Sequence, residues 1–539
     1  MKRNPAGPVL SLLILALLIP VIPGAITAGA AESGHVIDSV VVDNRDIFMI
    51  DSSRYDYWIY RLANKLHFTT RKFIIRRELL QSTGDTFSRR LADETERNLR
   101  SLDYIWNAAI TFQPDDNGPN IMKVTTNDTW TMSAGLSIDR KARENTCLIQ
   151  FEESNLLGLG QFLSLKYYLR DFDADYGVVS VRERRLLGSR LFGEFYYNDD
   201  PENGLKGITF GLPFYSLSAP FSFRCLYFAE KRRDDYYRNG IIEASNHARG
   251  TDFDFEAAWR FGSYREKLVT RVYFSYRDIA VFDKRVRVSG GYNGAQPYPF
   301  PSDSLYYSFT PEVAFQYMDY ITTSRINGFR RSEDFLTGSS ASVAFGWAID
   351  PSRRRTIFKT AGFALGFSDF IRSNLFFVNF AANSWFLGNV TYRKMFNLSI
   401  KYYNNLWPWL TTAINVRFDE DIRRDGLPGL HLGENNGLRG YPKNHLSGRR
   451  RFFGNIENRL FSGIQILSVE FGAVQFFDFG HAWIRQRDVH LKDILWSTGV
   501  GLRFGLEKIS NTGLMRVDFA YGADIDDWQL SLGLGQYFK

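Results

Sequence analysis

The segment Phe253–Phe261, with the sequence FDFEAAWRF, alternates between two kinds of side chain. Its odd positions are apolar and its even positions are mostly charged: Phe253, Phe255, Ala257, Trp259 and Phe261 against Asp254, Glu256, Ala258 and Arg260. In a β-strand, successive side chains point to opposite faces of the sheet. The segment therefore predicts a strand with one apolar and aromatic face and one charged face.

The same two-residue period recurs on both sides of this segment, and helical spacing largely disappears after Thr131. It is found in residues 163–170, in residues 396–402 and in residues 530–538. In the last of these, Leu530, Leu532, Leu534 and Phe538 alternate with Ser531, Gly533, Gly535 and Tyr537. This predicts a terminal strand that faces lipid and carries a near-terminal aromatic.

Alternation alone does not say which face of the sheet is wet. In a soluble sandwich the apolar face meets another sheet, whereas in a membrane barrel it meets lipid and the charged face lines a hydrated lumen. The chain has 46 Phe and 28 Tyr and is 44% hydrophobic, yet its mean hydropathy is slightly negative. The connections also differ in length, from the short segment 198–204 to the long segments 278–304 and 419–450. These features favour an antiparallel transmembrane β-barrel over residues 130–539.

The first thirty residues have the pattern of an export signal. Lys2 and Arg3 precede the apolar run Val9–Ile19, and the small residues Ala28-Gly29-Ala30 offer a cleavage site. The run is shorter than the ~20 apolar residues of a spanning helix. We therefore expect residues 1–30 to be a cleaved signal peptide.

Residues 34–129 have mixed periodicity and predict one small α+β domain. Strands are expected at 36–42, 108–112 and 121–126, and helices at 70–80 and 88–102. Ser88 is a candidate N-cap for the second helix. The predicted order is β-α-α-β-β.

The remaining composition argues against catalysis and against nucleic acid as a partner. The seven histidines are scattered without metal-ligand spacing, and no serine lies in a G-x-S-x-G context. We therefore expect neither an enzyme nor a metal or cofactor site. Cys147 and Cys225 are too few for a disulfide framework, and we expect both to be unpaired. The net charge of +7 includes two charges of the signal peptide and says little.

Several stretches resemble the superfamily of outer-membrane assembly and secretion barrels, which includes BamA-like and TamA-like proteins and two-partner secretion transporters. The resemblance extends over essentially the whole mature chain. The stretches that carry it are Gly84-Asp85 with Glu96–Ile105, Glu153–Gly160 (ESNLLGLG), Leu438-Arg439-Gly440-Tyr441, and Phe476-x-Asp478-x-Gly480. The second is similar to an E-x-N-L-L-G-x-G motif, the third to an R-G-F/Y motif, and the fourth to an inward-facing F-x-D-x-G strand.

The resemblance implies a barrel of sixteen strands with one N-terminal POTRA-like periplasmic domain. It also implies that Arg439 lies in a loop folded back into the lumen and contacts acidic side chains of the inner wall. A confined guanidinium needs a carboxylate, and alternation places Asp478 and Glu457 on the same wall. Gly440 would let the backbone pass closely, and Tyr441 would fill space while hydrogen-bonding at its tip.

The function implied by the resemblance is insertion or translocation of client polypeptides at the bacterial outer membrane. The POTRA-like domain would receive an unfolded client by β-augmentation, and the barrel would open at its first-to-last strand seam. The implied partners are outer-membrane lipid and lipopolysaccharide, the client, and accessory lipoproteins or a second copy of the chain. A passive porin and a structural or lipid-handling barrel stay open as alternatives, because BamA-like and two-partner secretion proteins carry more than one POTRA domain.

Overall fold

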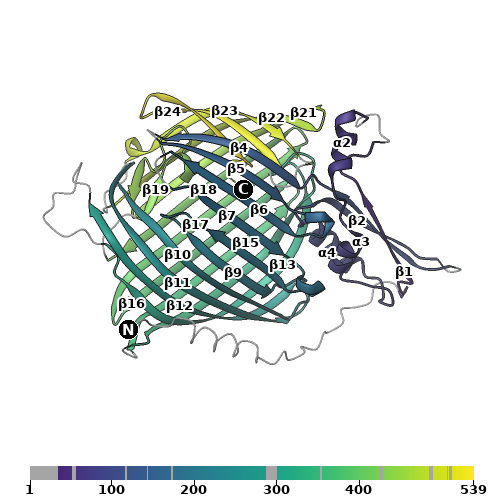
Figure 1. The fold of residues 1–539 in the computed structure, drawn as a ribbon, viewed down its shortest axis with the longest axis horizontal. Helices are drawn as coiled ribbons and strands as arrows, with labels where there is room; N and C mark the ends of the chain where they lie inside the picture. Colours follow the sequence, from purple (N-terminus) through teal and green to yellow (C-terminus); the bar gives the residue numbers. More distant parts are fainter. Residues whose placement is uncertain are drawn as a thin grey trace.

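The computed structural model describes residues 34–538, apart from 51–55, 116–117, 142–143, 172–173, 239, 287–299, 353–354, 425–428, 485–489, 507 and 509–512. The predicted signal peptide, residues 1–30, lies outside the described residues. Figure 1 shows a large β-barrel with a smaller front domain at one of its ends. In the part of the chain that is described, no helix is long and apolar enough to cross a membrane.

The described residues of the front domain form three strands and three helices. They are β1 (Ser39–Arg45), α2 (Trp58–Leu66), α3 (Lys72–Glu78), α4 (Arg89–Arg100), β2 (Ile105–Gln113) and β3 (Ile121–Asp128). The sheet order is β1-β3-β2, with β3 parallel to β1 and antiparallel to β2. Fully buried apolar side chains such as Ile75, Leu99, Ile105 and Val124 pack the helices on the sheet, and each contributes roughly 1.5–3 kcal/mol.

Helix α2 was not expected from the sequence. Its apolar residues Trp58, Ile59, Leu62 and Leu66 are exposed rather than packed on the sheet, so the segment has no single core-facing stripe. The expected helices correspond to α3 and α4. Ser88 stands in the N-cap position of α4, but its side chain makes no capping hydrogen bond.

In the described residues, the barrel is a closed sheet of twenty strands rather than the sixteen that the resemblance implied. The first six are short: β4 (Met132–Lys141), β5 (Glu144–Glu153), β6 (Phe162–Arg170), β7 (Tyr176–Glu183), β8 (Phe192–Asn198) and β9 (Leu205–Leu212). The next nine are long: β10 (Phe221–Arg238), β11 (Ile241–Gly262), β12 (Glu266–Val286), β13 (Ser304–Thr323), β14 (Glu333–Asp350), β15 (Arg355–Ile371), β16 (Asn374–Leu387), β17 (Val390–Trp407) and β18 (Leu410–Arg423). The last five are β21 (Arg450–Ile466), β22 (Val469–Trp483), β23 (Leu495–Gly505), β24 (Leu514–Gly522) and β25 (Asp527–Leu534). Because the first six strands are only seven to ten residues long, the chain has room for more strands than the sixteen that were expected.

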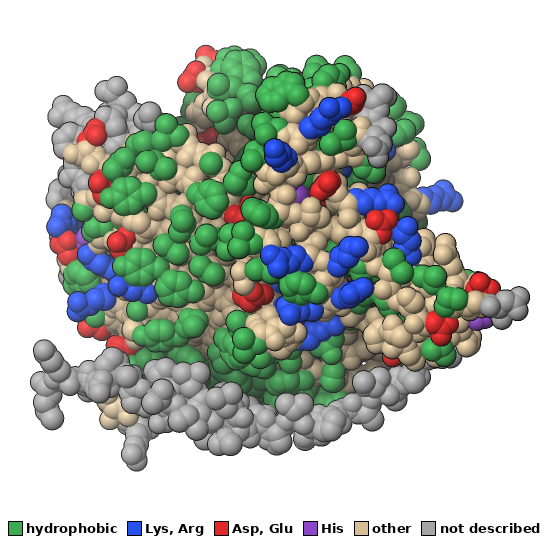
Figure 2. Space-filling view, turned by 45° about the vertical axis from the view of Figure 1, so that its right-hand side comes forward, with side chains coloured by type: hydrophobic (Ala, Val, Ile, Leu, Met, Phe, Trp, Pro, Cys, Tyr) green, Lys and Arg blue, Asp and Glu red, His purple; other side chains and the backbone are tan. Residues whose placement is uncertain are grey.

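Apolar side chains cover the outside of the barrel, and charged ones line the inside. On β6, Leu165 and Tyr167 are exposed to the outside, whereas the inward Lys166 pairs with Glu152 at 3.0 Å. Figure 2 shows hydrophobic side chains spread over the barrel wall. A wall that is apolar outside and charged inside is typical of a membrane barrel.

The end of the chain departs from the expected lipid-facing strand. Leu530, Leu532 and Leu534 of β25 face outward and are 61–73% exposed. Phe538 does not continue this row, because the chain leaves the strand after Leu534 and turns into the lumen. There its ring lies 6.4 Å from that of Tyr403. The expectation for Phe538 was wrong, because inward contacts and not strand parity decide its position.

Candidate functional site

The connection between β18 and β21 folds back onto the inner wall of the barrel. It contains β19 (Leu430–Leu432), the 3-10 turn η3 (Glu434–Asn436) and β20 (Leu446–Gly448), and β19 and β20 pair with each other. Leu432, Leu438 and Tyr441 of this connection are fully buried beside Phe453 and Ala482. We call residues 429–449 the lumen loop.

Arg439, at the centre of the lumen loop, is held by two wall carboxylates. Its Nε and Nη2 donate to the two carboxylate oxygens of Asp478, each at 2.8 Å, and its Nη1 donates to Glu457 Oε1 at 2.7 Å. All three side chains are at most 1% exposed. Burial by itself lowers the pKa of a guanidinium, but the charges of Asp478 and Glu457 outweigh it and raise the pKa of Arg439. The pair with Asp478 is bidentate and buried, and bidentate hydrogen bonds between charged groups are among the strong ones.

Two aromatic rings enclose the same guanidinium from its faces. The Arg439 Cζ lies 3.7 Å from the ring centroid of Phe476 and 4.1 Å from that of Tyr537. The Tyr537 hydroxyl donates to the carbonyl oxygen of Glu434 in the lumen loop at 2.7 Å. Residues after β25 therefore take part in holding the loop through a cation–π contact and a hydrogen bond.

Gly440 and Tyr441 hold the backbone of the lumen loop against the inner wall at β23 and β24. Gly440 has a φ of 78°, and a Cβ there would lie 3.1 Å from the backbone nitrogen of Gly522. The Tyr441 hydroxyl donates to the carbonyl oxygen of Trp496 at 2.9 Å and accepts from the backbone nitrogen of Asp524 at 3.2 Å. A left-handed position in close backbone contact requires glycine.

Gly480 of β22 leaves room for the loop. A Cβ at this position would lie 3.1 Å from Leu432 Cδ2 and 2.8 Å from Phe453 Cβ. A larger residue would crowd the neighbouring wall strand β21, where the Phe452 carbonyl oxygen would lie 2.7 Å from that Cβ, as well as the β19–β20 hairpin. The structure thus brings every predicted site residue of the loop and of the wall into one cluster.

The ion network continues beyond the residues predicted from the sequence. Arg459 Nε donates to Glu457 Oε2 at 2.9 Å. Asp518 accepts from Arg503 at 2.6 Å and from Arg516 at 2.9 Å, and its carboxylate lies 3.7 Å from Arg439. Strand parity would have found this group, because residues 516 and 518 share the inner face of β24 while residues 515 and 519 are exposed outside.

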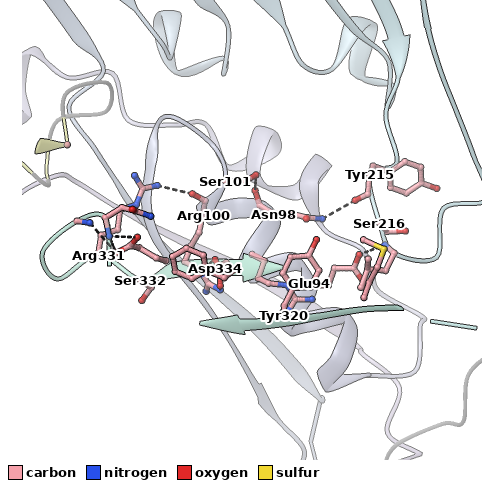
Figure 3. Close-up of a pocket in the computed structure, with 18 of the residues that line it drawn as sticks. Glu94, Asn98, Arg100, Ser101, Tyr215, Ser216, Tyr320, Arg331, Ser332 and Asp334 are labelled. Carbon is pink, nitrogen blue, oxygen red and sulfur yellow. Dashed lines mark hydrogen bonds and ion pairs between the residues drawn. The ribbon is translucent and has the colours of Figure 1, made fainter. Parts of the chain in front are cut away.

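The front domain packs across the mouth of the barrel. Arg100 of α4 forms two hydrogen bonds, at 2.8 and 2.7 Å, with the carboxylate of Asp334 on β14. Asn98 donates to the carbonyl oxygen of Tyr215 at 3.1 Å, and Figure 3 shows Asn98 pointing at it. A cavity of about 690 Å³ remains between α4 and the barrel. It is open to solvent and lined by both polar and apolar side chains, so α4 narrows the mouth without sealing it.

Within the described residues, no group of histidine, cysteine or acidic side chains could hold a metal ion. Cys147 on β5 and Cys225 on β10 are both free. The clustered groups can fix a loop, but they contain no nucleophile with an adjacent base.

Comparisons with known proteins give matches among solved structures alone. No protein-family model matches the chain, and no curated protein sequence matches it. The structure is similar to CdiB from Acinetobacter baumannii, with 12% identity, a TM-score of 0.41 and coverage of 98% of this chain and 96% of that one. It is also similar to CdiB from Escherichia coli (12% identity, TM-score 0.40, 92% and 76% covered). A third similar structure is BamA from Haemophilus ducreyi lacking POTRA domains 1–3 (10% identity, TM-score 0.35, 92% and 83% covered).

Proposed function

We propose that this chain is an outer-membrane barrel that inserts client polypeptides into the outer membrane or passes them across it. Residues 34–129 form its POTRA-like periplasmic receiving domain, and residues 130–539 form the barrel, after removal of residues 1–30. The lumen loop is the gate, and Arg439 is its lock. The observation that carries the proposal is the burial of Arg439 between Asp478 and Glu457.

The width of the barrel explains why a loop inside its lumen would be needed to restrict flow. Barrels of about 16–18 strands already leave an aqueous channel when nothing fills them. A barrel of twenty strands needs internal structure to restrict flow, and the lumen loop supplies it. A passive porin gains nothing from a buried ionic lock or from a front domain over its mouth, which is why we favour assembly or secretion.

The two edges of the front-domain sheet differ in their capacity to bind a client strand. On β2, Ile110 already receives side-chain bonds: its nitrogen donates to Glu96 at 2.8 Å and its carbonyl accepts from Arg89 at 2.6 Å. The carbonyl of Ala108 accepts from Arg100 at 3.3 Å. Among the described residues no strand pairs with the outer edge of β1. We therefore assign β1 as the edge that receives an unfolded client by β-augmentation.

The barrel has one junction suited to opening. Continuous antiparallel ladders join all neighbouring strands from β4 through β25. The barrel closes between β25 and β4, its last and first strands, which are hydrogen-bonded neighbours. We assign this seam as the place where the barrel opens, because no turn of the chain connects β25 to β4 and a client strand that pairs there interrupts a single strand junction. Membrane lipid and lipopolysaccharide would surround the seam, and accessory lipoproteins or a second copy of the chain could act beside it.

The direct test is catalysed folding of a client. The protein is reconstituted in liposomes, and a urea-unfolded eight-stranded outer-membrane barrel is added as the client. The folded fraction of the client is followed by gel mobility. Protection of the client from added protease reports its transport into the liposome interior. Faster folding, or protection, than in liposomes with heat-inactivated protein supports the proposal. Equal rates without protection would contradict both insertion and secretion. A photo-crosslinker at Val41 of β1 should capture the client more efficiently than one at Thr111 of β2.

A further inference from the structure

The segment Trp58–Arg77, with the sequence WIYRLANKLHFTTRKFIIRR, is basic and amphipathic. It contains no Asp or Glu and carries six cationic residues: Arg61, Lys65, Arg71, Lys72, Arg76 and Arg77. Six of its apolar residues are between 41% and 74% exposed: Trp58, Ile59, Leu62, Leu66, Phe68 and Phe73. Contiguous exposed apolar groups mark an interaction surface, and exclusively positive charge selects an anionic partner.

Two barrel turns next to this segment repeat the same structure. The sequences ESNLLGLGQF (153–162) and ERRLLGSRLF (183–192) place E, L, L, G and F at equal spacing. In each, the second leucine is left-handed, with φ of 54° at Leu157 and 51° at Leu187. Leu157 is 48% exposed, and Leu187 is fully exposed. Each turn therefore exposes the side chain of one leucine at its tip.

Helix α3 places an arginine beside each leucine tip. Arg71 Nε donates to the carbonyl oxygen of Leu157 at 3.3 Å. The guanidinium of Arg77 lies 3.1 Å from the position that a Cβ on Gly188, next to Leu187, would take. The Arg77 guanidinium also lies over the Phe73 ring, 4.9 Å from its centroid. Among the described residues, no carboxylate pairs with either arginine, so their positive charges are not neutralised within the protein.

These tips lie where the apolar outer wall ends. The turns follow β5 and β7, whose outward residues Ile149 and Val181 are exposed apolar side chains. Figure 2 shows Lys and Arg side chains gathered where the front domain meets the barrel wall. Figure 1 places α2 and α3 beside the same end of the barrel. The surface is thus continuous with the lipid-facing wall at its periplasmic rim.

We propose that residues 58–77, together with Leu157 and Leu187, bind the periplasmic leaflet of the outer membrane by taking up anionic phospholipid headgroups. We call this surface the rim strip. The leucine tips and the apolar residues of α2 enter the boundary between headgroups and acyl chains, while the arginines contact lipid phosphates. Amphipathic basic helices lie in such interfaces with their apolar faces buried, and guanidinium binds phosphate bidentately.

The inference rests on the proposed membrane location of the barrel. Its consequence is that the leaflet holds the front domain at a fixed tilt over the mouth, so the composition of the periplasmic leaflet would set how the domain presents β1 to a client. Neutral lipid would leave the rim strip held by its apolar side chains alone.

The test uses the full chain in lipid nanodiscs, with Cys147 and Cys225 changed to serine and one fluorescent label per variant. Labels at L187C, at V41C on β1 and at L532C on the outer wall are compared. The discs contain phosphatidylcholine with phosphatidylglycerol, and some lipids carry a nitroxide quencher near the headgroup. We expect quenching at position 187 to exceed that at position 41 by about threefold or more, because interfacial groups sit ~5–10 Å inside the headgroup boundary.

The three positions separate the possible failures. If label 532 is quenched but label 187 behaves like label 41, the rim strip does not bind lipid, whatever the barrel does. If label 532 is not quenched either, the barrel itself is not in the membrane and the proposed function fails as well. The double variant Lys72→Gln/Arg76→Gln, carried with the label at 187, should weaken leaflet binding by about thirtyfold in anionic discs. It should have little effect in pure phosphatidylcholine; equal effects in both would contradict headgroup recognition.

Discussion

Replacement of Arg439 by alanine should release the lumen loop. Among the described residues, Arg439 is the one cation that contacts Asp478. Glu457 keeps its bond to Arg459 at 2.9 Å, so the loss falls mainly on Asp478. That carboxylate would keep the Asn455 amide, at 2.9 Å, as its main donor.

The size of the effect follows from the contacts. Three side-chain hydrogen bonds of 2.7–2.8 Å join Arg439 to carboxylates that are 0% exposed. Removing one partner of such a buried pair costs about 3–5 kcal/mol. Since each 1.4 kcal/mol is a factor of ten, the undocked loop should gain roughly two to three and a half orders of magnitude in population.

Cysteine labelling measures this population directly. Leu438 is fully buried, so a cysteine at 438 reacts with maleimide only when the loop undocks. In a background lacking the two native cysteines, Arg439→Ala should speed labelling by about a hundredfold or more. Arg265→Ala, which removes an ion pair of 3.0 Å with Asp319 whose two side chains are 55% and 41% exposed, should change the rate by less than about threefold, because an exposed pair contributes little. Equal rates in the two variants would refute the lock.

Four further changes probe the same account. Gly440→Ala should undock the loop at a cost of about 1–3 kcal/mol, because its φ is 78°; the same labelling assay measures it, and an unchanged rate would contradict the backbone contact. Tyr537→Ala should speed labelling by roughly tenfold through loss of the cation–π contact, whereas Tyr537→Phe should retain most of it. Burial lowers the pKa of both His431 and His445. The undocked loop therefore binds protons more tightly. Labelling at 438, expressed relative to labelling of an exposed cysteine at 187 so that thiol protonation cancels, should accelerate as pH falls below about 6.5 and should lose this pH dependence when both histidines are changed to glutamine. Arg100→Ala should free the front domain and accelerate proteolysis at the domain junction, by roughly tenfold or more for two lost charged hydrogen bonds; Arg100→Lys should be intermediate, and resistance equal to wild type would contradict the docking.

Alternation was sufficient to predict the barrel wall. It works because every second residue meets lipid, so Leu165 and Tyr167 lie outside while Lys166 lies inside. The same parity placed Asp478 and Glu457 on one inner wall, where the structure pairs both with Arg439. Periodicity cannot give the number of strands, however, because over seven to ten residues the sequence pattern of a short strand is not distinguishable from that of a turn.

What the sequence missed depends on contacts between distant segments. Phe538 continues the parity of β25 but turns inward, where the Arg459 guanidinium lies over its ring at 5.0 Å. The stretch Glu153–Gly160 was matched only as a motif, whereas its Gly158 lets the turn approach Thr69 of the front domain. Helix α2 buries little apolar surface, so its sequence lacks the apolar stripe that predicts a helix packed on a core. None of these positions follows from local spacing, because each is decided by a partner far along the chain.

The most direct test of the gated lumen is planar-bilayer conductance of the reconstituted protein, with wild type recorded beside Arg439→Ala. The account predicts low, flickering conductance in wild type that rises in the variant. Steady, large conductance in wild type that the substitution leaves unchanged would contradict it and identify an open pore.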